Sequence, residues 1–206
     1  KISYFVGISG KSASGKSTVA GLLQKQYDAT IISIDWFYYS DDEELKRIFE
    51  KDGAINWDDP RSIRIDELIR VITELRSNKP ATITEFDFET NLYKAQQKTI
   101  NPSKLFIIEG IFAFSYPQLN QLFDLKVFVE CSDELCKQRR LERDVRDRKY
   151  TEEYALHSYN TYCKPNQEKF VVWQLWEADV VLNWSFQNPR GLKSLTLLLD
   201  GELEGK

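Results

Sequence analysis

The sequence contains the stretch Gly10-Lys11-Ser12-Ala13-Ser14-Gly15-Lys16-Ser17, which matches the pattern G-x-x-x-x-G-K-[ST] in full. An apolar run, Tyr4-Phe5-Val6-Gly7-Ile8, precedes it and a helix-like pattern follows, which is the context in which this pattern binds phosphate. Glycines let the backbone approach phosphate oxygens, and a helix N-terminus with a lysine attracts their charge. We therefore predict a nucleotide-binding loop formed by Gly10, Ser12, Ala13, Ser14, Gly15, Lys16, Ser17 and Thr18.

The composition is that of one acidic domain. The chain has 206 residues, of which 42% are hydrophobic, and a formal net charge of -4, so we expect a single domain over residues 1–206 and no nucleic-acid partner. Its three cysteines lack the spacing of a metal site, and its N-terminal apolar run is too short to span a membrane. We expect a reduced, cytoplasmic protein without a membrane partner. The sequence allows a homo-oligomer without specifying one.

Strand-like and helix-like segments alternate along the chain, which is typical of an α/β fold with a parallel sheet. Five buried strands are predicted at residues 3–9, 30–34, 105–109, 125–130 and 179–182. Helices on both faces of the sheet are predicted at residues 16–27, 65–77, 132–144 and 151–170, with Ser132 as an N-cap. Together with the loop at 10–17, this pattern predicts a P-loop NTPase fold.

Two further segments lie outside this sheet. A strand-like piece at residues 82–88 is separated by a polar stretch from residues 98–100, and the two predict a small β-hairpin that flanks the main sheet. Beyond Trp184 the pattern is ambiguous, because residues 191–199 fit either a helix or a strand.

Asp35 stands directly after the second predicted strand, in Ile34-Asp35-Trp36-Phe37-Tyr38. Strand ends in open parallel sheets face the ligand crevice. A carboxylate at that place can accept the proton of an attacking hydroxyl group or orient it. The alternative is that Asp35 only caps the turn that follows.

Glu109 ends the apolar run at residues 105–109 and therefore reaches the same edge of the sheet as the glycine-rich loop. A carboxylate there can hold magnesium directly or through water, together with the hydroxyl group of Ser17. We therefore predict a metal site at Ser17 and Glu109. A purely structural acid at the end of a buried strand is the alternative.

Five arginines form a cluster on the predicted helix at 132–144 and the polar stretch after it, namely Arg139, Arg140, Arg143, Arg146 and Arg148. Such a run commonly forms a solvated helix face, but guanidinium groups near a phosphate loop also screen the charge of a transferring phosphoryl group. The position of the cluster before a long helix predicts an arginine-rich closing lid at about residues 143–151.

These motifs in this order resemble the uridine-cytidine kinase family, whose relatives include phosphoribulokinase and nicotinamide riboside kinase. The resemblance extends from the first strand to about residue 183. Besides the loop, it is carried by Asp35-Trp36-Phe37-Tyr38, Asn56-Trp57-Asp58-Asp59-Pro60, Phe86-Asp87-Phe88, Glu109-Gly110-Ile111, Arg143-Asp144, Tyr159, Lys164-Pro165 and Ala178-Asp179-Val180-Val181.

The resemblance implies a kinase that uses ATP and Mg²⁺ and takes a small nucleoside-like molecule as its substrate. It implies catalytic roles for Asp35 as the base, and for Lys16, Arg143 and Arg148 at the phosphates. It also implies that Asp58 binds ribose hydroxyl groups. The implied substrate-binding residues are Tyr38, Trp57, Asp58, Phe86, Phe88, Asn91 and Arg143. As alternatives, the aromatic residues are core and Asp58 is a turn former.

The chain departs from the family pattern where the base is read. Phe86 replaces a tyrosine, Asn91 stands at the position of a histidine, and Tyr150 replaces an arginine after the lid. These changes alter the hydrogen bonds that the pocket can make, and such changes discriminate strongly between substrates. The only histidine of the chain, His157, is interpreted as structural or surface-exposed.

Three functions follow as hypotheses. The first is transfer of the γ-phosphoryl group of ATP to a nucleoside 5′-hydroxyl, as in uridine kinases. A nicotinamide riboside kinase or another ribosyl kinase is the alternative within that class. An ATP-binding regulatory module without turnover is the alternative of another class.

Overall fold

The computed structural model describes residues 3–40 and 43–205 of the chain. Its centre is a five-stranded parallel sheet with the strand order β2-β7-β1-β8-β9. The strands are β1 (Tyr4–Ser9), β2 (Thr30–Ser33), β7 (Leu105–Glu109), β8 (Leu125–Glu130) and β9 (Val180–Asn183). The five predicted strands are confirmed, and their ends differ from the prediction by at most one residue.

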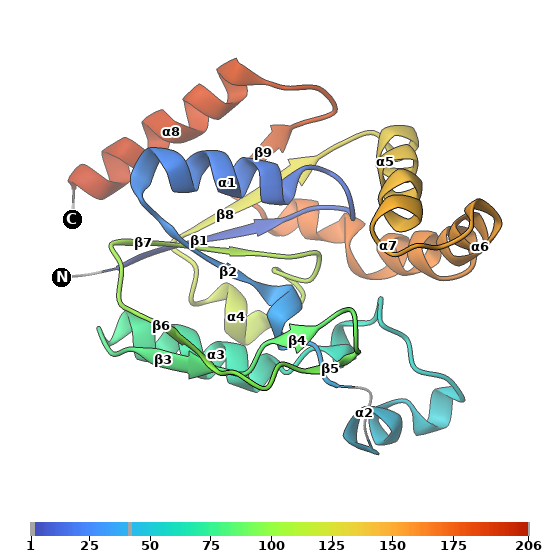
Figure 1. The fold of residues 1–206 in the computed structure, drawn as a ribbon. Coiled ribbons are helices and arrows are strands. Elements are labelled where there is room, and N and C mark those ends of the chain that lie inside the picture. The colour runs from blue at the N-terminus through green and yellow to red at the C-terminus, as the bar shows by residue number, and fades with distance from the viewer. Residues whose placement is uncertain (1–2, 41–42, 206) are drawn as a thin grey trace.

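Helices cover both faces of the sheet, because successive side chains of each strand point to opposite faces. Val6 and Ile8 of β1 pack on one face in a cluster with α1 and α8, whereas Phe5 packs on the other face with α3 and α4. Figure 1 shows these three layers, with α1 and α8 on one side and α3 and α4 on the other. The helices are α1 (Lys16–Tyr27), α3 (Ile65–Arg76), α4 (Pro117–Asn120) and α8 (Pro189–Glu204).

Gly7 is the point at which the second face comes closest to the sheet. A Cβ atom added at Gly7 would lie 2.8 Å from ring atoms of Phe123 and 2.9 Å from the ring of Phe114. The missing side chain therefore lets two aromatic rings pack directly on the strand that leads into the glycine-rich loop.

Beyond the carboxyl ends of the strands lie the helices that follow β8 (Figure 1). They are α5 (Asp133–Arg146), α6 (Glu152–Ser158), a π-helical turn (Tyr159–Cys163) and α7 (Lys164–Phe170). The predicted helix at 151–170 is thus confirmed as a helical run that the π turn interrupts. Ser132 occupies the predicted N-cap position of α5, but its side chain makes no capping hydrogen bond. A 3₁₀ helix, Val172–Glu177, follows α7.

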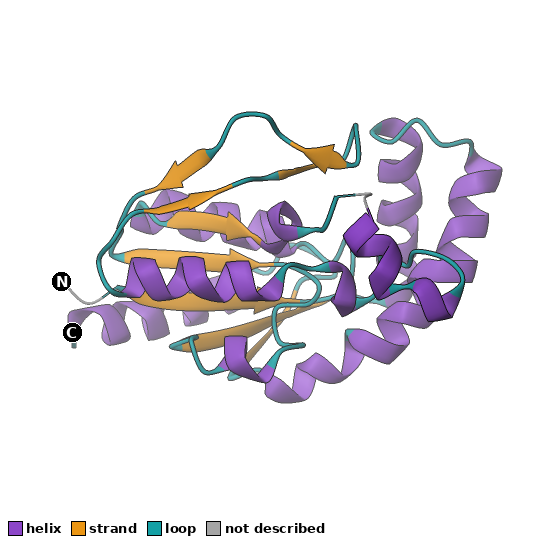
Figure 2. Cartoon of the chain, turned by 90° about the horizontal axis from the view of Figure 1, so that it is seen from below, coloured by secondary structure: helices purple, strands orange, loops and turns teal. Residues whose placement is uncertain are grey.

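The predicted hairpin is present but divided into two ladders. β3 (Ala81–Ile83) pairs with β6 (Lys98–Ile100), and β4 (Phe86–Asp87) pairs with β5 (Leu92–Tyr93), all antiparallel. The prediction of one strand over 82–88 is therefore wrong. Between the ladders, two residues on one side (84–85) face four on the other (94–97). The carboxylate of Glu85 bridges this interruption, because it forms ion pairs of 3.0 Å with both Lys94 and Lys98. Figure 2 shows the ladders beside the main sheet.

The segment left open by the sequence is helical. Residues 191–199 belong to α8, whose start is capped by the Asn188 side chain through a hydrogen bond from the backbone N–H of Gly191. Leu195 and Leu199 of this helix are buried against the sheet. Among residues 3–40 and 43–205, the structure has no helix with the length and apolar character needed to cross a membrane.

Candidate active site

The loop at residues 10–17 has a backbone that only glycine tolerates at two positions. Gly10 and Gly15 have φ angles of 151° and 106°. A Cβ atom at Gly10 would lie 2.4 Å from the carbonyl oxygen of Val129, and one at Gly15 would lie 2.4 Å from Cδ1 of Trp184. The hydroxyl oxygen of Ser14 is buried and has no hydrogen-bond partner among the residues described. An unpaired polar atom of this kind fits a loop that is completed by a phosphate group.

Lys16 opens α1 from this loop. Its Nζ atom is buried and donates a hydrogen bond of 2.8 Å to the main-chain carbonyl of Lys11. Burial lowers the pKa of Lys16, while the nearby carboxylates of Glu109 and Asp35 act in the opposite direction. The ammonium group is therefore in a place where added negative charge stabilises it.

Lys11 holds the loop to the neighbouring strand and helix. Its ammonium group lies 3.2 Å from Glu130 at the end of β8 and 2.6 Å from Asp133 at the start of α5. The side chain of Lys11 is thus paired with two carboxylates and ties the loop to β8 and α5.

The two acids predicted at the strand ends come together in the structure. Asp35 lies in the 3₁₀ helix Ile34–Phe37 directly after β2, and its N–H donates to the hydroxyl oxygen of Ser33 at 3.3 Å. Glu109 accepts a hydrogen bond of 3.4 Å from the hydroxyl group of Ser17. Burial raises the pKa of both carboxyl groups. Lys16 opposes this shift in each of them, and the charge of Asp35 adds to the shift of Glu109.

The oxygen atoms of Ser17 and Glu109 fit a magnesium ion. Magnesium prefers oxygen ligands and is commonly held by one or two protein groups together with substrate phosphates and water. In the part of the chain that the structure describes, no group of three or more His, Cys, Asp or Glu side chains forms a metal cage. A pair of oxygens beside a phosphate loop is the arrangement that such a shared site needs.

Three arginines of the predicted cluster converge on Asp144. The guanidinium groups of Arg140, Arg143 and Arg148 lie 2.7, 3.7 and 3.4 Å from its carboxylate oxygens. Arg140 and Arg143 also donate hydrogen bonds of 2.8 and 3.2 Å to the hydroxyl oxygen of Ser12. The structure therefore brings Arg140 and Arg143 to the phosphate loop and Arg148 to their shared partner Asp144.

The arginine cluster has two different parts. Arg139 donates to the carbonyl oxygen of Ser185 at 3.0 Å, and Arg146 pairs with the exposed carboxylate of Asp147 at 2.7 Å. These two arginines therefore make structural or surface contacts. Arg140 was part of the predicted cluster but was given no role, and the structure places it at the loop.

Two buried glutamines that the sequence analysis missed connect the helices after the lid to the loop. The Gln167 side-chain oxygen accepts a hydrogen bond of 3.1 Å from the backbone N–H of Ser12. Gln174 is fully buried, and its side-chain oxygen accepts from the Ser9 hydroxyl at 2.7 Å and from the N–H of Phe114 at 2.8 Å. No sequence motif marks these residues, because their partners are 60 to 165 residues away.

Four aromatic residues predicted around the acceptor form one cluster. Phe86 is its centre, with ring centroids 5.7 Å from Tyr38, 5.6 Å from Trp57 and 4.9 Å from Phe88. Tyr38 and Phe86 are buried, whereas Phe88 is 51% exposed. Burial raises the pKa of Tyr38 well above its ordinary value, and the charges of Asp35 and Asp58 add to this shift. The cluster therefore lies near both carboxylates.

The segment around Asp58 faces the lid helices. Asn56 donates to the side-chain oxygen of Asn166 on α7 at 3.1 Å, and it accepts the N–H of Asp58 at 3.1 Å. Asn91 differs from the other predicted substrate residues, because it is exposed and has a φ of 57° in the turn between β4 and β5. Its backbone N–H donates to the carbonyl oxygen of Asp87. The turn conformation therefore accounts for an asparagine at this position.

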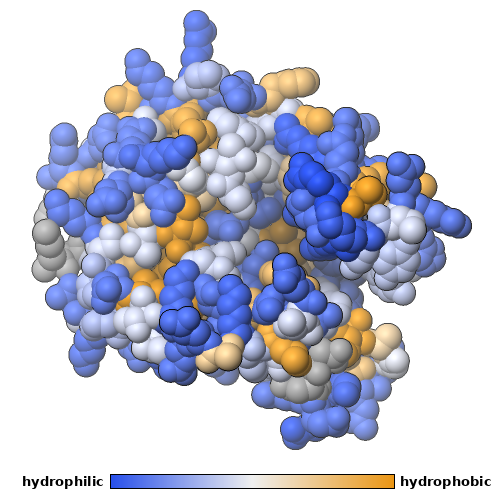
Figure 3. Space-filling view, in the orientation of Figure 1, coloured by the Kyte–Doolittle hydropathy of each residue, from blue (hydrophilic) through white to orange (hydrophobic). Residues whose placement is uncertain are grey.

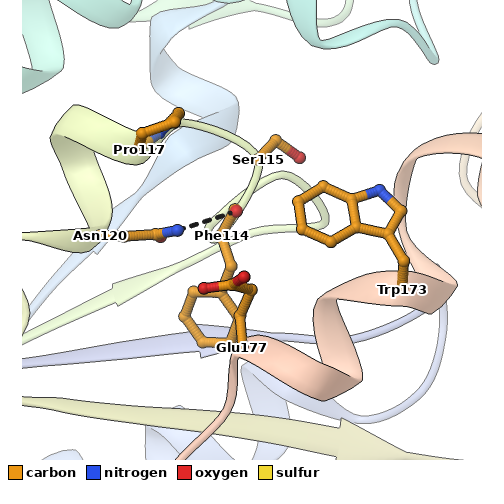
Figure 4. Close-up of a pocket in the computed structure, with 6 residues that line it drawn as sticks. All are labelled: Phe114, Ser115, Pro117, Asn120, Trp173 and Glu177. Carbon is orange, nitrogen blue, oxygen red and sulfur yellow. Dashed lines mark hydrogen bonds between the residues drawn. The ribbon is translucent and has the colours of Figure 1, made fainter.

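The surface is hollowed beside these residues. Figure 3 shows a hollow between the surface over α5, α6 and α7 and the surface over α2 (Glu43–Ile48). A separate cavity of about 260 Å³ lies between the loop after β7 and the 3₁₀ helix Val172–Glu177 (Figure 4). It is lined by Phe114, Ser115, Pro117, Asn120, Trp173 and Glu177. These six residues include none of the predicted site residues.

A parallel sheet with this strand order, opened by a glycine-rich loop and an α-helix, defines the class of the protein. The chain is a P-loop protein of the kind that binds nucleoside triphosphates. Residues 5–188 match the family described as Phosphoribulokinase / Uridine kinase family, and the chain belongs to this family. The predicted family is therefore confirmed.

Similar proteins from several organisms match most of the chain. The uridine kinase of Halobacterium salinarum is 31% identical and the match covers 96% of this chain and 84% of that protein. Uridine-cytidine kinase A of Dictyostelium discoideum is 29% identical over 94% of this chain and 37% of that protein. Phosphoribulokinase from Rhodobacter spheroides has a TM-score of 0.65 at 17% identity, over 88% of this chain and 70% of that one, which shows a shared fold.

Some of the similar proteins are much longer than this chain, so their similarity concerns only part of their length. The chain spans 37–40% of the length of the Dictyostelium protein and of two further relatives. Their activities as whole proteins therefore belong to longer chains.

Proposed function

We propose that the chain transfers the γ-phosphoryl group of ATP to the 5′-hydroxyl of a nucleoside, giving a nucleoside monophosphate and ADP. One observation carries this proposal: Lys16 and Arg143 both bond to the glycine-rich loop, and Asp35 follows β2 so near to them that their charges oppose the raised pKa of its carboxyl group. A base, a phosphate-binding cation and a charge-screening arginine are the groups that phosphoryl transfer needs together.

The reaction divides into steps that these residues perform. Asp35 accepts the proton of the acceptor hydroxyl as the oxygen forms its bond to the γ-phosphorus. The bond from the γ-phosphorus to the oxygen that bridges it to the β-phosphorus breaks, and ADP leaves with that oxygen. Lys16 binds the phosphate oxygens, and Arg143 and Arg148 stabilise the negative charge of the transferring group.

Magnesium would be held by Ser17 and Glu109 and would offset the charge of the phosphate groups. Lowering that charge matters here, because the pKa values of Asp35 and Glu109 are both raised by burial and one acid raises that of the other. Within the chain, the positive charge of Lys16 compensates the negative charges of these two carboxylates only in part.

The acceptor would lie between the aromatic cluster and the lid. Asp58 offers two oxygens to a ribose diol, and the rings of Tyr38, Trp57, Phe86 and Phe88 offer surfaces for a base. With Phe86 in place of a tyrosine and Asn91 in an exposed turn, this pocket has few polar groups to read a base. Uridine kinase-like activity is the first expectation, and a nicotinamide riboside or other ribosyl acceptor is the alternative. The activity would belong to nucleoside salvage in the cytoplasm.

The test is ADP release with MgATP and a panel of uridine, cytidine, adenosine and nicotinamide riboside. Asp35→Asn is the control protein, and it should bind ATP while losing turnover by roughly 100-fold or more, in the range of a lost general base. Turnover with one acceptor that depends on Asp35 supports the proposal. ATP binding with no turnover for any acceptor argues for the regulatory reading instead. A homo-oligomer stays a prediction, which light scattering of the same protein would test.

A further inference from the structure

Asp144 is a buried carboxylate at the centre of three arginines. It lies on α5 with 1% of its surface exposed. Its Oδ2 atom accepts a hydrogen bond of 2.7 Å from Nε of Arg140, while Oδ1 lies 3.7 Å from Nε of Arg143 and 3.4 Å from Nη1 of Arg148. Buried carboxylates are stabilised by such partners, and the three arginines share this one.

The two oxygens of Asp144 make contacts of different quality. Oδ2 forms a short hydrogen bond, so the Arg140 guanidinium group has a fixed orientation. Oδ1 of Asp144 and Nε of Arg143 are both buried and have no hydrogen-bond partner within residues 3–40 and 43–205. Catalytic hydrogen bonds are often long without substrate and shorten when it binds. Arg143 is therefore held near Asp144 by charge, while its hydrogen bond goes to the hydroxyl oxygen of Ser12.

The charges of this group favour an added anion. Three guanidinium groups share one carboxylate in direct contact, so the group itself carries excess positive charge, which Asp35 and Asp58 offset only from beyond ion-pair distance. Burial lowers the pKa of Arg143, and the charges of Arg140 and Arg148 add to that effect. A nearby phosphoryl group would supply the missing negative charge.

Ser12 connects this group to the nucleotide loop. Its hydroxyl oxygen accepts hydrogen bonds from Arg140 and Arg143, and its backbone N–H donates to Gln167. Arg140 and Arg143 therefore contact the loop directly. A small change in the position of Asp144 would move both of these guanidinium groups relative to the loop.

We propose that Asp144 is a positioning residue that holds Arg140, Arg143 and Arg148 as one unit, aimed at the phosphoryl group in transfer. The proposal rests on the proposed function. Asp144 is buried beside its arginine partners, and it acts by setting the places of three guanidinium groups that would otherwise repel one another. Its contribution therefore falls on the transition state more than on the binding of ATP.

Asp144→Asn keeps the size of the side chain and removes its charge. The expected result is a kcat lower by about 10- to 100-fold, the range for residues that orient a catalytic group, with the KM for ATP within about threefold of the wild type. Asp147→Asn is the matched control, because Asp147 is another lid acid that pairs with an arginine, Arg146, but is exposed. It should leave both constants within about twofold, as for an exposed pair.

A binding measurement separates this proposal from the proposed function. Fluoroaluminate added to MgADP mimics a phosphoryl group in transfer. In the presence of the best acceptor, it should therefore lower the Kd of a fluorescent ADP analogue for the wild-type protein. Asp144→Asn should bind MgADP alone as the wild type does but lose this tightening. No tightening by the wild type contradicts the proposed kinase reaction, whereas equal tightening by both proteins overturns the role of Asp144.

A variant that keeps the charge guards against misfolding. If Asp144→Asn does not fold, Asp144→Glu retains a carboxylate but shifts it by one methylene. It should lower kcat at least about threefold with an unchanged KM for ATP, because small misplacements of catalytic groups reduce turnover. Wild-type kcat in a folded Asp144→Asn or Asp144→Glu protein would show that the arginines do not depend on this residue, and would overturn the proposal.

Discussion

The Nζ atom of Lys16 donates a hydrogen bond to the main-chain carbonyl oxygen of Lys11, 2.8 Å away in the same loop. The ammonium group is buried, and burial lowers its pKa. A carbonyl group is a partial partner for a full positive charge, so the free loop keeps a buried cation that is incompletely compensated. Phosphate oxygens would replace the carbonyl as its partner.

Lys16→Met should therefore separate binding from stability. Without the charge, the affinity for MgATP should fall by at least about tenfold, which corresponds to the loss of one charge-assisted hydrogen bond. The melting temperature should change little, because the loss of an unfavourably buried charge is offset by the loss of the cation that compensates Asp35 and Glu109. Calorimetric titration and thermal unfolding measure the two effects. Lys46→Met is the control, since Lys46 is exposed and pairs with Glu43 within its own helix. A clear loss of stability in Lys16→Met alone would contradict this account.

Asp35→Asn should stabilise the protein without ligand at neutral pH. Burial raises the pKa of Asp35, although Lys16 and Arg143 partly oppose the shift. Protonation therefore stabilises the folded state: this stability is fully present below the ordinary carboxyl pKa and is lost as the pH rises through the raised value. The asparagine variant carries no such charge. Its advantage in melting temperature should be largest at pH 7–8 and should shrink as the pH falls to about 4, the ordinary carboxyl range. An advantage that does not change with pH would point to another cause.

The sheet could be predicted because its determinants are local. The glycine-rich loop fixes a strand before Gly10 and a helix after Lys16, and continuous apolar runs mark the other buried strands. Asp35 and Glu109 were placed in the site because each directly follows or ends such a run, and parallel strands end at the same edge.

The contacts that assemble the site could not be predicted, because they join residues far apart in the sequence. Ser12 meets Gln167 across 155 positions and Arg140 across 128, and nothing local to any of them indicates the partner. The divided hairpin was missed for a similar reason. Glu85 pairs with Lys94 and Lys98 on the opposite side of the hairpin, and nothing in the pattern of residues 82–88 indicates these partners.

Gln174→Leu should destabilise the fold strongly. Beyond Ser9 and Phe114, the buried amide of Gln174 donates to the carbonyl oxygens of Ile111 and Phe170 at 2.8 Å. Leucine has a similar volume but leaves these buried groups unpaired, so we expect a loss of roughly 3 kcal/mol in the free energy of unfolding. Gln138→Leu is the control, because Gln138 is exposed and bonds to Glu142 on its own helix. Urea denaturation measures the stability of both variants. Equal stability would show that the buried groups bonded to Gln174 find other hydrogen-bond partners in its absence.

Asp58 and Asp59 are adjacent acids with different expected roles, and they provide a paired test of the acceptor site. Asp59 is 4% exposed and caps the 3₁₀ helix Pro60–Ser62. Its carboxylate accepts hydrogen bonds from the backbone N–H and from the side chain of Arg61. Asp59→Ala should therefore lower stability by about 1–2 kcal/mol, as for the loss of a cap, in thermal or urea unfolding.

Asp58 should behave in the opposite way. Its charge acts on Tyr38 and Arg140 at the site, and its backbone is already fixed by Asn56. Asp58→Asn should keep the wild-type melting temperature and the KM for ATP, while kcat/KM for the acceptor falls by about 10- to 100-fold, as for a lost charge-assisted hydrogen bond. If Asp58→Asn instead destabilises the fold and leaves the acceptor kinetics intact, Asp58 is a turn residue. The ribose would then need another partner.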